Sequence, residues 1–361
     1  MPSVAVPGRV NLIGEHIDYH NLPVLPMAIQ RRIRLDYQPL AASIVRARSE
    51  HYEPVEIGLS GTLQVGAPGE WSNYIKAAVE AAKTRWNVPH GIEADVTSDL
   101  PAAAGLSSSS ALLTAFTIAL LRANGIEATA DELMDILPDG EQFVGTRGGG
   151  MDHAAVVASK AGCALLVEFG PLRLSDVPIP DGWSFLVAHS LKTAEKSGGA
   201  REHYNSRRVA GQAALNKLGI KSYREVAELP DLGALSDEEK RTFRHVVTEG
   251  QRVCQAVAAM RRADKEAFGE LLCESHRSMR DDLQVSCGEL DELVEVAMKN
   301  RALGARLTGA GFGGCAIVFC EVGERGRIAQ ALVDGFYAKR SGFVQDRHLI
   351  FAEPSAGALH G

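Results

Sequence analysis

A glycine-rich stretch near the end of the chain helps to decide between a Rossmann fold and an α+β fold. Its sequence is Gly309-Ala310-Gly311-Phe312-Gly313-Gly314. These residues match the G-x-G-x-x-G pattern of dinucleotide-binding Rossmann folds, which must follow a strand and open a helix. The residues after them, 315–319, have the character of a strand, so the Rossmann interpretation fails. The glycines are expected to form a turn with accessible amides, suited to a phosphate or a close backbone, with a plain strand connection as the alternative. Strands and helices also lack steady βαβ alternation, which favours an α+β fold.

Hydrophobic patterning predicts the individual elements. Helices are expected at 71–86, 107–121, 151–159 and 324–339, and the charge-rich stretch 201–300 is expected to be helical. Strands are expected at 3–6, 33–37, 44–48, 55–58, 92–97, 164–169, 183–189, 315–321 and 348–352.

The chain has 361 residues, more than the roughly 250–300 that a single core reaches, so we expect two lobes with a shared cleft. The proline-rich stretch 171–180 predicts the change of lobe, with one lobe over 1–180 and the other over 181–361. A net charge of −7 argues against a protein built to hold nucleic acid or an anionic membrane. No apolar run is long enough to span a bilayer, and six scattered cysteines suit free thiols. These features predict a cytoplasmic protein and leave open whether it is a monomer or a weak dimer.

Four consecutive serines at 107–110 follow Gly105 and open a predicted helix. A glycine turn that leads into a helix N-terminus presents unpaired amides and the positive end of the helix dipole to an anion. The hydroxyl groups can add hydrogen bonds or ligate Mg²⁺. A single serine is enough for an N-cap, so the run favours a phosphate site. No Walker A sequence is present.

Glu15, His16 and Asp18 lie within four residues near the start of the chain. Polar groups this close together suit the vicinal hydroxyls of a sugar, and a solvated charged turn is the plain alternative. The spacing of His16 and His20 also fits a helical zinc pair. Asn21-Leu22-Pro23 predicts a turn there, which argues against the metal interpretation.

Asp152 follows three glycines at 148–150 and stands at the start of a predicted helix. Aspartate is a favoured N-cap, but a helix N-terminus also keeps a carboxylate ionised. Phosphoryl transfer needs positioning and charge neutralisation more than a strong base. An ionised carboxylate that orients a hydroxyl and accepts its proton late would suffice. From these residues alone, Asp152 can be interpreted either as a helix N-cap or as a catalytic carboxylate.

Segments 7–19, 101–111 and 307–315 resemble, in this order, the three signature motifs of the GHMP small-molecule kinases. The first contains Gly8-Arg9-Val10-Asn11-Leu12-Ile13-Gly14-Glu15-His16 and is similar to the galactokinase signature of that family. Further matches such as 204–208 extend the resemblance through nearly the whole chain. The resemblance implies a sugar kinase that uses ATP and Mg²⁺. It also implies an N-terminal lobe like ribosomal protein S5 domain 2, a ferredoxin-like C-terminal lobe, and an active site between them.

The resemblance gives individual positions a role. Asp152 would be the catalytic carboxylate facing the sugar C1 hydroxyl, and Arg9 would stabilise the transition state and keep Asp152 ionised. The sugar contacts would be Glu15, His16, Asp18, Gly149 and Tyr204. The ATP phosphates would be wrapped by Ala103, Ala104, Gly105, Leu106, Ser107, Ser108 and Ser109, and Ser109 would also ligate Mg²⁺.

Departures from the family pattern concentrate around the sugar and the metal. The family's second Mg²⁺ carboxylate aligns with Gly140, so Glu141 or a water molecule would take its place. The usual Asn-x-Gly after the first motif reads His20-Asn21-Leu22. His153 stands where the family has Gln, and we expect it to pack within its helix.

The leading interpretation is ATP-dependent phosphorylation of a galactose-like monosaccharide at its anomeric hydroxyl. A kinase for arabinose, a hexuronic acid or N-acetylgalactosamine is the alternative within the class. A sugar sensor that binds ligands without efficient turnover is the alternative outside it.

Overall fold

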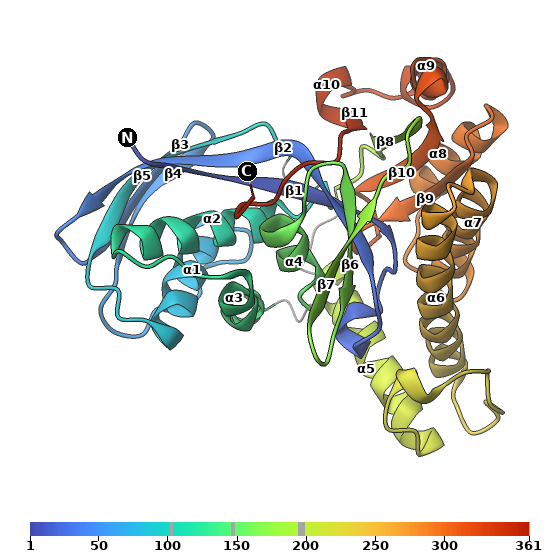
Figure 1. Cartoon of the computed structure of the whole chain (residues 1–361), viewed down its shortest axis with the longest axis horizontal. Coiled ribbons are helices and arrows are strands. Elements are labelled where there is room, and N and C mark those ends of the chain that lie inside the picture. Colours follow the sequence, from blue (N-terminus) through green and yellow to red (C-terminus); the bar gives the residue numbers. More distant parts are fainter. Residues whose placement is uncertain (102–103, 146–148, 194–198, 361) are drawn as a thin grey trace.

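Helices and strands alternate irregularly along the chain, which confirms the expected α+β class. The computed structural model describes residues 1–101, 104–145, 149–193 and 199–360. Figure 1 shows a sheet covered by helices in the first half of the chain and a second sheet flanked by long helices in the second half.

The first sheet has the strand order β1-β2-β5-β3-β4. β3 and β5 pair in parallel, and the other neighbours pair antiparallel. In β1 burial alternates only at the start, where Val4 and Val6 are buried and Ala5 is half-buried, and every residue from Val6 to Ile13 is buried. The strands are β1 (Ser3–Ile13), β2 (Leu25–Leu40), β3 (Ile44–Ser49), β4 (Tyr52–Gly58) and β5 (Gly91–Ser98).

Four helices lie on one face of this sheet (Figure 1). They are α1 (Ser72–Arg85), α2 (Ser108–Ala123), α3 (Ala130–Val144) and α4 (Met151–Ala158). Every residue of α2 from Ser110 to Leu121 is buried, since the helix is enclosed between the sheet and its neighbours. This enclosure explains the long apolar run and fixes the position of the serines at the start of the helix.

Two elements of the first half differ from the sequence-based expectation. Helix α3 is not predicted because Pro138 lies inside it. Its start carried a signal, since Thr129 and Glu132 form a capping box. The proline-rich stretch expected to change lobe contains strand β7 (Arg173–Pro178), which forms a hairpin with β6 (Cys163–Glu168).

The second sheet has the order β11-β8-β10-β9 and is antiparallel. In β8, Phe185 and Val187 belong to the main core, whereas Leu186 and Ala188 face a second core that includes parts of α8 and α9. Because both faces are covered, β8 and β10 are mostly apolar along their length, whereas β9 contains the buried Arg306. The strands are β8 (Trp183–His189), β9 (Gly304–Thr308), β10 (Cys315–Glu321) and β11 (Leu349–Ala352).

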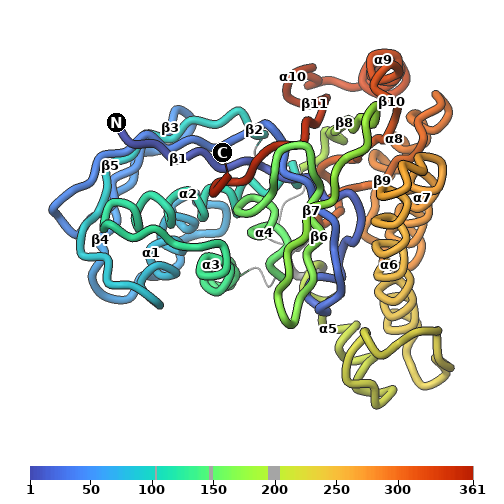
Figure 2. Tube along the Cα trace, in the orientation of Figure 1, coloured from blue at the N-terminus to red at the C-terminus, as the bar shows by residue number. Residues whose placement is uncertain are grey.

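The helical stretch of the second half divides into several pieces. Helices α6 and α7 lie side by side (Figure 2), with α7 packed against β9 of the second sheet. Helix α5 packs against α6 and η1. The α-helices are α5 (Gly199–Leu218), α6 (Asp237–Arg261), α7 (Lys265–Asp281), α8 (Gly288–Lys299), α9 (Arg325–Gly335) and α10 (Gln345–His348). Short 3₁₀ segments are η1 (Asp18–His20), η2 (Tyr223–Glu225), η3 (Val322–Glu324) and η4 (Tyr337–Lys339).

The end of the chain returns to the first half of the molecule (Figure 1). Ile29 and Pro354 form an isolated bridge, and the N–H of Ala358 donates to the carbonyl of Val156 at 2.8 Å. The terminal segment therefore connects the two halves through backbone contacts, in addition to the packing of Phe185 and Val187 of β8 in the main core. None of the helices in the described ranges has both the length and the apolar character required to cross a membrane.

Candidate active site

Arg9 and Asp152, which lie far apart in the sequence, form an ion pair. The backbone N–H of Arg9 donates to the Leu106 carbonyl at 3.1 Å, which holds strand β1 against the serine segment. The guanidinium Nε and Nη2 lie 2.7 and 2.5 Å from Asp152 Oδ1, and Nη1 donates to the Gly105 carbonyl at 2.7 Å. One side chain therefore joins the first motif, the serine segment and the mid-chain aspartate.

The position of Asp152 follows from the start of α4. Gly150 is the N-cap with a φ of 100°, a conformation that favours glycine, and Asp152 falls in the first turn. Its side chain is 12% exposed, so a ligand can reach the carboxylate. Burial alone would lower the pKa of Arg9, but the carboxylates of Asp152, Glu15 and Glu141 reverse this and raise it. The arginine therefore stays charged beside the aspartate.

Asp18 lies near Asp152 because the backbone of Asp18 and Tyr19 closely contacts Gly149. A Cβ at position 149 would overlap the backbone of Asp18 and Tyr19, so only glycine allows this approach. The Gly149 N–H donates to Asp18 Oδ2 at 3.0 Å. Burial, followed by the charge of Asp152, raises the pKa of Asp18. Two carboxylates thus lie near one another at the edge of a small polar space.

His16 is held as a neutral imidazole between two parts of the protein. Burial lowers the pKa of His16 to about 3. Nε2 lies 3.1 Å from the Ala310 carbonyl, and Nδ1 lies 2.8 Å from the Tyr19 hydroxyl. This pairing requires the Nε2–H tautomer, with Nδ1 accepting from tyrosine. The ring therefore fixes the first motif against the glycine-rich turn, and Tyr204 packs beside it with ring centroids 5.0 Å apart.

These side chains line a partly open cavity whose empty space, including the part open to solvent, is ≈ 440 Å³. Its polar groups come from β1, the turn that leads to η1, η1 itself, α3, α4, α5 and the glycine-rich turn. The structure brings together Arg9, Glu15, His16, Asp18, Glu141, Asp152 and Tyr204, with Gly150, Met151, Gly309 and Ala310 completing the wall. The sequence-based expectation that Glu15, His16 and Asp18 share a site with Asp152 agrees with this geometry.

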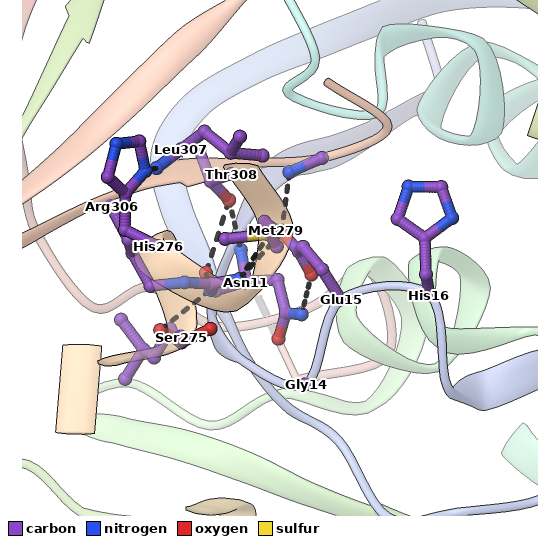
Figure 3. A network of polar contacts seen from close by, with 12 residues as sticks. Asn11, Gly14, Glu15, His16, Ser275, His276, Met279, Arg306, Leu307 and Thr308 are labelled. Carbon is purple, nitrogen blue, oxygen red and sulfur yellow. Dashed lines mark hydrogen bonds and ion pairs between the residues drawn. The ribbon is translucent and has the colours of Figure 1, made fainter. Parts of the chain in front are cut away.

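The Glu15 carboxylate belongs to a buried polar network (Figure 3). Its Oε1 accepts from the Gly309 N–H at 2.5 Å, and its Oε2 accepts from the Asn11 amide. Arg306 lies on the other side, with Nη2 3.8 Å from Glu15 Oε1 and Nη1 donating to the Asn11 and Leu12 carbonyls. Burial raises the pKa of Glu15 although Arg306 and Arg9 oppose it. The network fastens the turn of the first motif to β9.

Glu249 is a second acidic centre of this network and is missed by the sequence-based prediction. It is fully buried on α6, and it accepts from the Gly14 N–H at 2.9 Å and from Arg252 Nε at 2.8 Å. Burial alone would raise the pKa of Glu249, but Arg252 and Arg306 lower it to about 2. The same buried face of α6 also carries His245 and Arg252, and this local pattern does not reveal that Glu249 contacts Gly14 and Arg306.

The serine segment meets the glycine-rich turn. Gly105 and Gly309 both have positive φ, and a Cβ at position 309 would lie 3.0 Å from the Gly105 carbonyl oxygen. In α2 the N–H of Ala111 bonds to the Ser107 carbonyl, which leaves the preceding amides of the first turn directed outward. Ser107 Oγ is buried and has no hydrogen-bond partner within the described residues. Ala103, the first residue predicted for this loop, lies outside the described residues.

The structure distinguishes Gly140 from Glu141. A Cβ at position 140 would lie 2.9 Å from Leu113 Cδ1, so this position faces the packing between helices. The Glu141 side chain lines the cavity and accepts from the Ser110 hydroxyl at 2.6 Å. His153 Nε2 lies 3.6 Å from Glu141 Oε1, and its ring is fully buried, in agreement with the expected packing role.

A protein cage for a metal ion is absent from the described parts of the chain, where no three His, Cys, Asp or Glu side chains cluster suitably. Carboxylate and hydroxyl oxygens are nevertheless present, from Glu141 and the serine segment. Mg²⁺ is normally held by one or two such groups together with substrate phosphates. The donor set therefore fits an ion that arrives with a phosphorylated ligand.

Family models match three parts of the chain. The GHMP kinases N terminal domain matches residues 73–160, and GHMP kinases C terminal matches residues 256–338. The galactokinase galactose-binding signature matches residues 3–39, which contain Arg9, Glu15 and Asp18.

Curated relatives match almost end to end. The chain is 35% identical to the galactokinase of Streptomyces coelicolor, with 98% of this chain and 92% of that protein covered. It is 36% identical to the galactokinase of Bos taurus, with coverage of 93% and 88%. A solved structure of Lactococcus lactis galactokinase complexed with galactose superposes with a TM-score of 0.87 at 27% identity, covering 98% of this chain and 94% of that one. A mevalonate kinase structure at 17% identity and a TM-score of 0.67 shares the fold. The chain therefore belongs to the GHMP kinase family and, within it, to the galactokinase group.

Proposed function

We propose that this protein transfers the γ-phosphoryl group of ATP to the anomeric hydroxyl of a galactose-like monosaccharide. The observation that carries the proposal is the Arg9–Asp152 ion pair, which lies where the polar cavity meets the serine segment. A reaction between a sugar hydroxyl and a triphosphate requires a cation and a carboxylate at this junction. The galactokinase relatives support the same reaction.

In this proposal Asp152 orients the hydroxyl and accepts its proton. The hydroxyl oxygen attacks the γ-phosphorus, the bond between that phosphorus and the β,γ-bridging oxygen breaks, and ADP leaves. Arg9 neutralises charge that accumulates on the transferring group, and it holds the Asp152 carboxylate in position through two nitrogens.

The sugar would lie in the cavity between η1 and the glycine-rich turn. Asp18 and Glu15 supply carboxylates for its hydroxyls, and Tyr204 and His16 form the walls. Gly149 would also contact the sugar, and because it carries no side chain the backbone of Asp18 can lie against it.

The ATP phosphates would lie against the serine segment. Ala103, Ala104, Gly105, Leu106, Ser107, Ser108 and Ser109 form this cradle in the proposal. Ser109 and Glu141 would hold Mg²⁺, which, when bound, neutralises the phosphate oxygens as the γ-phosphoryl group moves. Because the reaction needs ATP, which is abundant in the cytoplasm, we propose that the enzyme acts there.

The test is ADP release in the presence of ATP and Mg²⁺ over a panel of sugars. The panel contains D-galactose, L-arabinose, D-galacturonate and N-acetyl-D-galactosamine. We expect rapid, sugar-dependent ADP release with D-galactose. Faster turnover with another member would change the substrate, and binding without ADP release for all four would favour the sensor.

A further inference from the structure

The turn that follows Asp18 packs on helix α5 through a contact between a large and a minimal side chain. His20 is 6% exposed, and its imidazole lies directly against the backbone of Gly211. A Cβ at position 211 would overlap His20 Nε2 and would lie 2.6 Å from His20 Cε1. The His20 ring is itself packed between Tyr19 and Tyr223, so a side chain at position 211 would require the ring or the helix to move.

Several contacts keep the two sides in this arrangement. The Tyr223 hydroxyl donates to the Gly211 carbonyl at 2.8 Å, and its ring packs on His20 with centroids 4.9 Å apart. Arg224 Nε donates to the Asn21 carbonyl at 2.8 Å. Within the described residues His20 Nε2 has no hydrogen-bond partner, so His20 and Gly211 interact through van der Waals packing.

The same helix carries Tyr204, seven residues before Gly211. Seven residues are two helical turns, so both positions lie on one face of α5, roughly 10 Å apart along its axis. Tyr204 lines the cavity and packs edge-on against Tyr19 with ring centroids 5.6 Å apart. Tyr19 thus packs on Tyr204 at the cavity, and His20 packs on Gly211 two helical turns farther along α5.

We propose that His20 and Gly211 form a complementary pair that sets how closely α5 approaches the sugar cavity, and so positions Tyr204 against the sugar. Both are positioning residues, since they act through Tyr204 and line no part of the cavity. The inference rests on the proposed sugar kinase function for its kinetic consequence. Its steric part concerns only the packing of the turn on the helix.

The test is a double-mutant cycle of Gly211→Ala and His20→Ala. The added methyl group pushes α5 outward by roughly 1 Å, and a displacement of that size at a binding site lowers efficiency by about 10–100-fold. We expect kcat/KM for D-galactose to fall by that factor in Gly211→Ala through a raised sugar KM, with the KM for ATP changed less than about twofold. In the His20→Ala background the same Gly211→Ala change should alter kcat/KM less than about twofold, since the clash is removed.

Thermal unfolding of the unliganded proteins tests the steric part separately. Alanine is the better helix former, so Gly211→Ala should raise Tm in the His20→Ala background and lower it in the wild-type background. Gln212→Ala, on the exposed side of α5, is the matched control and should change neither sugar KM nor Tm appreciably.

Two results would overturn the pair. One is a Gly211→Ala decrease in kcat/KM that is equal in the wild-type and His20→Ala backgrounds. The other is a rise in KM that is equal for the sugar and for ATP. If the wild type releases no ADP with any sugar, the proposed function fails. The Tm cycle then still decides whether His20 and Gly211 are coupled.

Discussion

At the scale of single residues, two buried glutamates illustrate how neighbours decide the state of a side chain. Glu15 and Glu249 are both almost fully buried, and each lies near Arg306. Burial alone would raise the pKa of both carboxyls, but at Glu249 the ion pair with Arg252 at 2.8 Å, together with Arg306, outweighs it and lowers the pKa to about 2. At Glu15 the opposing charges of Arg306 and Arg9 do not outweigh burial, so its pKa is raised. Sequence alone gives both residues the same chemistry.

Glu141 is the residue that the metal proposal needs. Glu141→Ala should raise the Mg²⁺ concentration that gives half-maximal rate by about tenfold, because it removes a charged oxygen from the phosphate side of the cavity. Glu141→Gln is the matched variant, since it retains an acceptor for the Ser110 hydroxyl and loses only the charge. Mg²⁺ titrations of both variants measure the effect. An unchanged Mg²⁺ dependence in both would remove Glu141 from the metal site.

At the scale of elements, the contact between the serine segment and the glycine-rich turn depends on one small residue. Gly309→Ala places a methyl group 3.0 Å from the Gly105 carbonyl oxygen and on a backbone with a φ of 86°. We expect the KM for ATP to rise by about tenfold. Gly323→Ala in η3, where a Cβ meets nothing within 4 Å, is the control. Steady-state kinetics with ATP varied check this, and a KM for ATP equal to that of the control would contradict it.

The elements also indicate where sequence patterns suffice and where they do not. Helix α2 and strand β10 are predicted because apolar patterning along the chain determines their burial. Helix α3 escapes prediction because Pro138 counts against it locally, while packing against α1 and α2 stabilises it. Strand β1 extends to Ile13, well beyond the predicted 3–6, since pairing with β2 supplies the hydrogen bonds of the later residues.

At the scale of the whole molecule, the buried network around Arg306 connects the first motif to α6 and β9. The folded-state pKa of Glu249, about 2, lies below its ordinary value of 4.5. The ionised carboxylate therefore contributes stability that is fully present above pH 4.5 and is lost as the pH falls toward 2. Glu249→Gln should lower the free energy of unfolding at pH 7 by about 3 kcal/mol, and the deficit should shrink near pH 3.

Urea unfolding at both pH values measures this difference. Glu295→Gln removes an exposed partner of Lys299 and is the control, for which little change is expected at either pH. A deficit for Glu249→Gln that is the same at pH 7 and pH 3 would contradict the electrostatic explanation.

Part of the cavity could be predicted from the sequence, because some of its residues fall in a short motif where several polar groups are adjacent. Glu15, His16 and Asp18 are of this kind, whereas Arg9 was assigned a role only by the resemblance to the GHMP kinases. Arg306 could not be predicted because it is a single charge in an apolar strand, and its partners Asn11 and Leu12 come from a distant part of the chain. Glu249 has Arg252 nearby on its own helix, but its contact with Gly14 also joins distant segments. The His20–Gly211 contact also depends on tertiary packing, which no local pattern contains.

The Asp152→Asn variant tests the central claim most directly. Asparagine keeps the size of the side chain and removes its ability to accept the hydroxyl proton, so kcat should fall by about 10²–10⁴-fold. Calorimetry with D-galactose should give a dissociation constant within a few-fold of the wild type, which confirms that the cavity remains intact. Turnover close to the wild-type rate would contradict the account, because the carboxylate paired with Arg9 would then take no part in the chemistry.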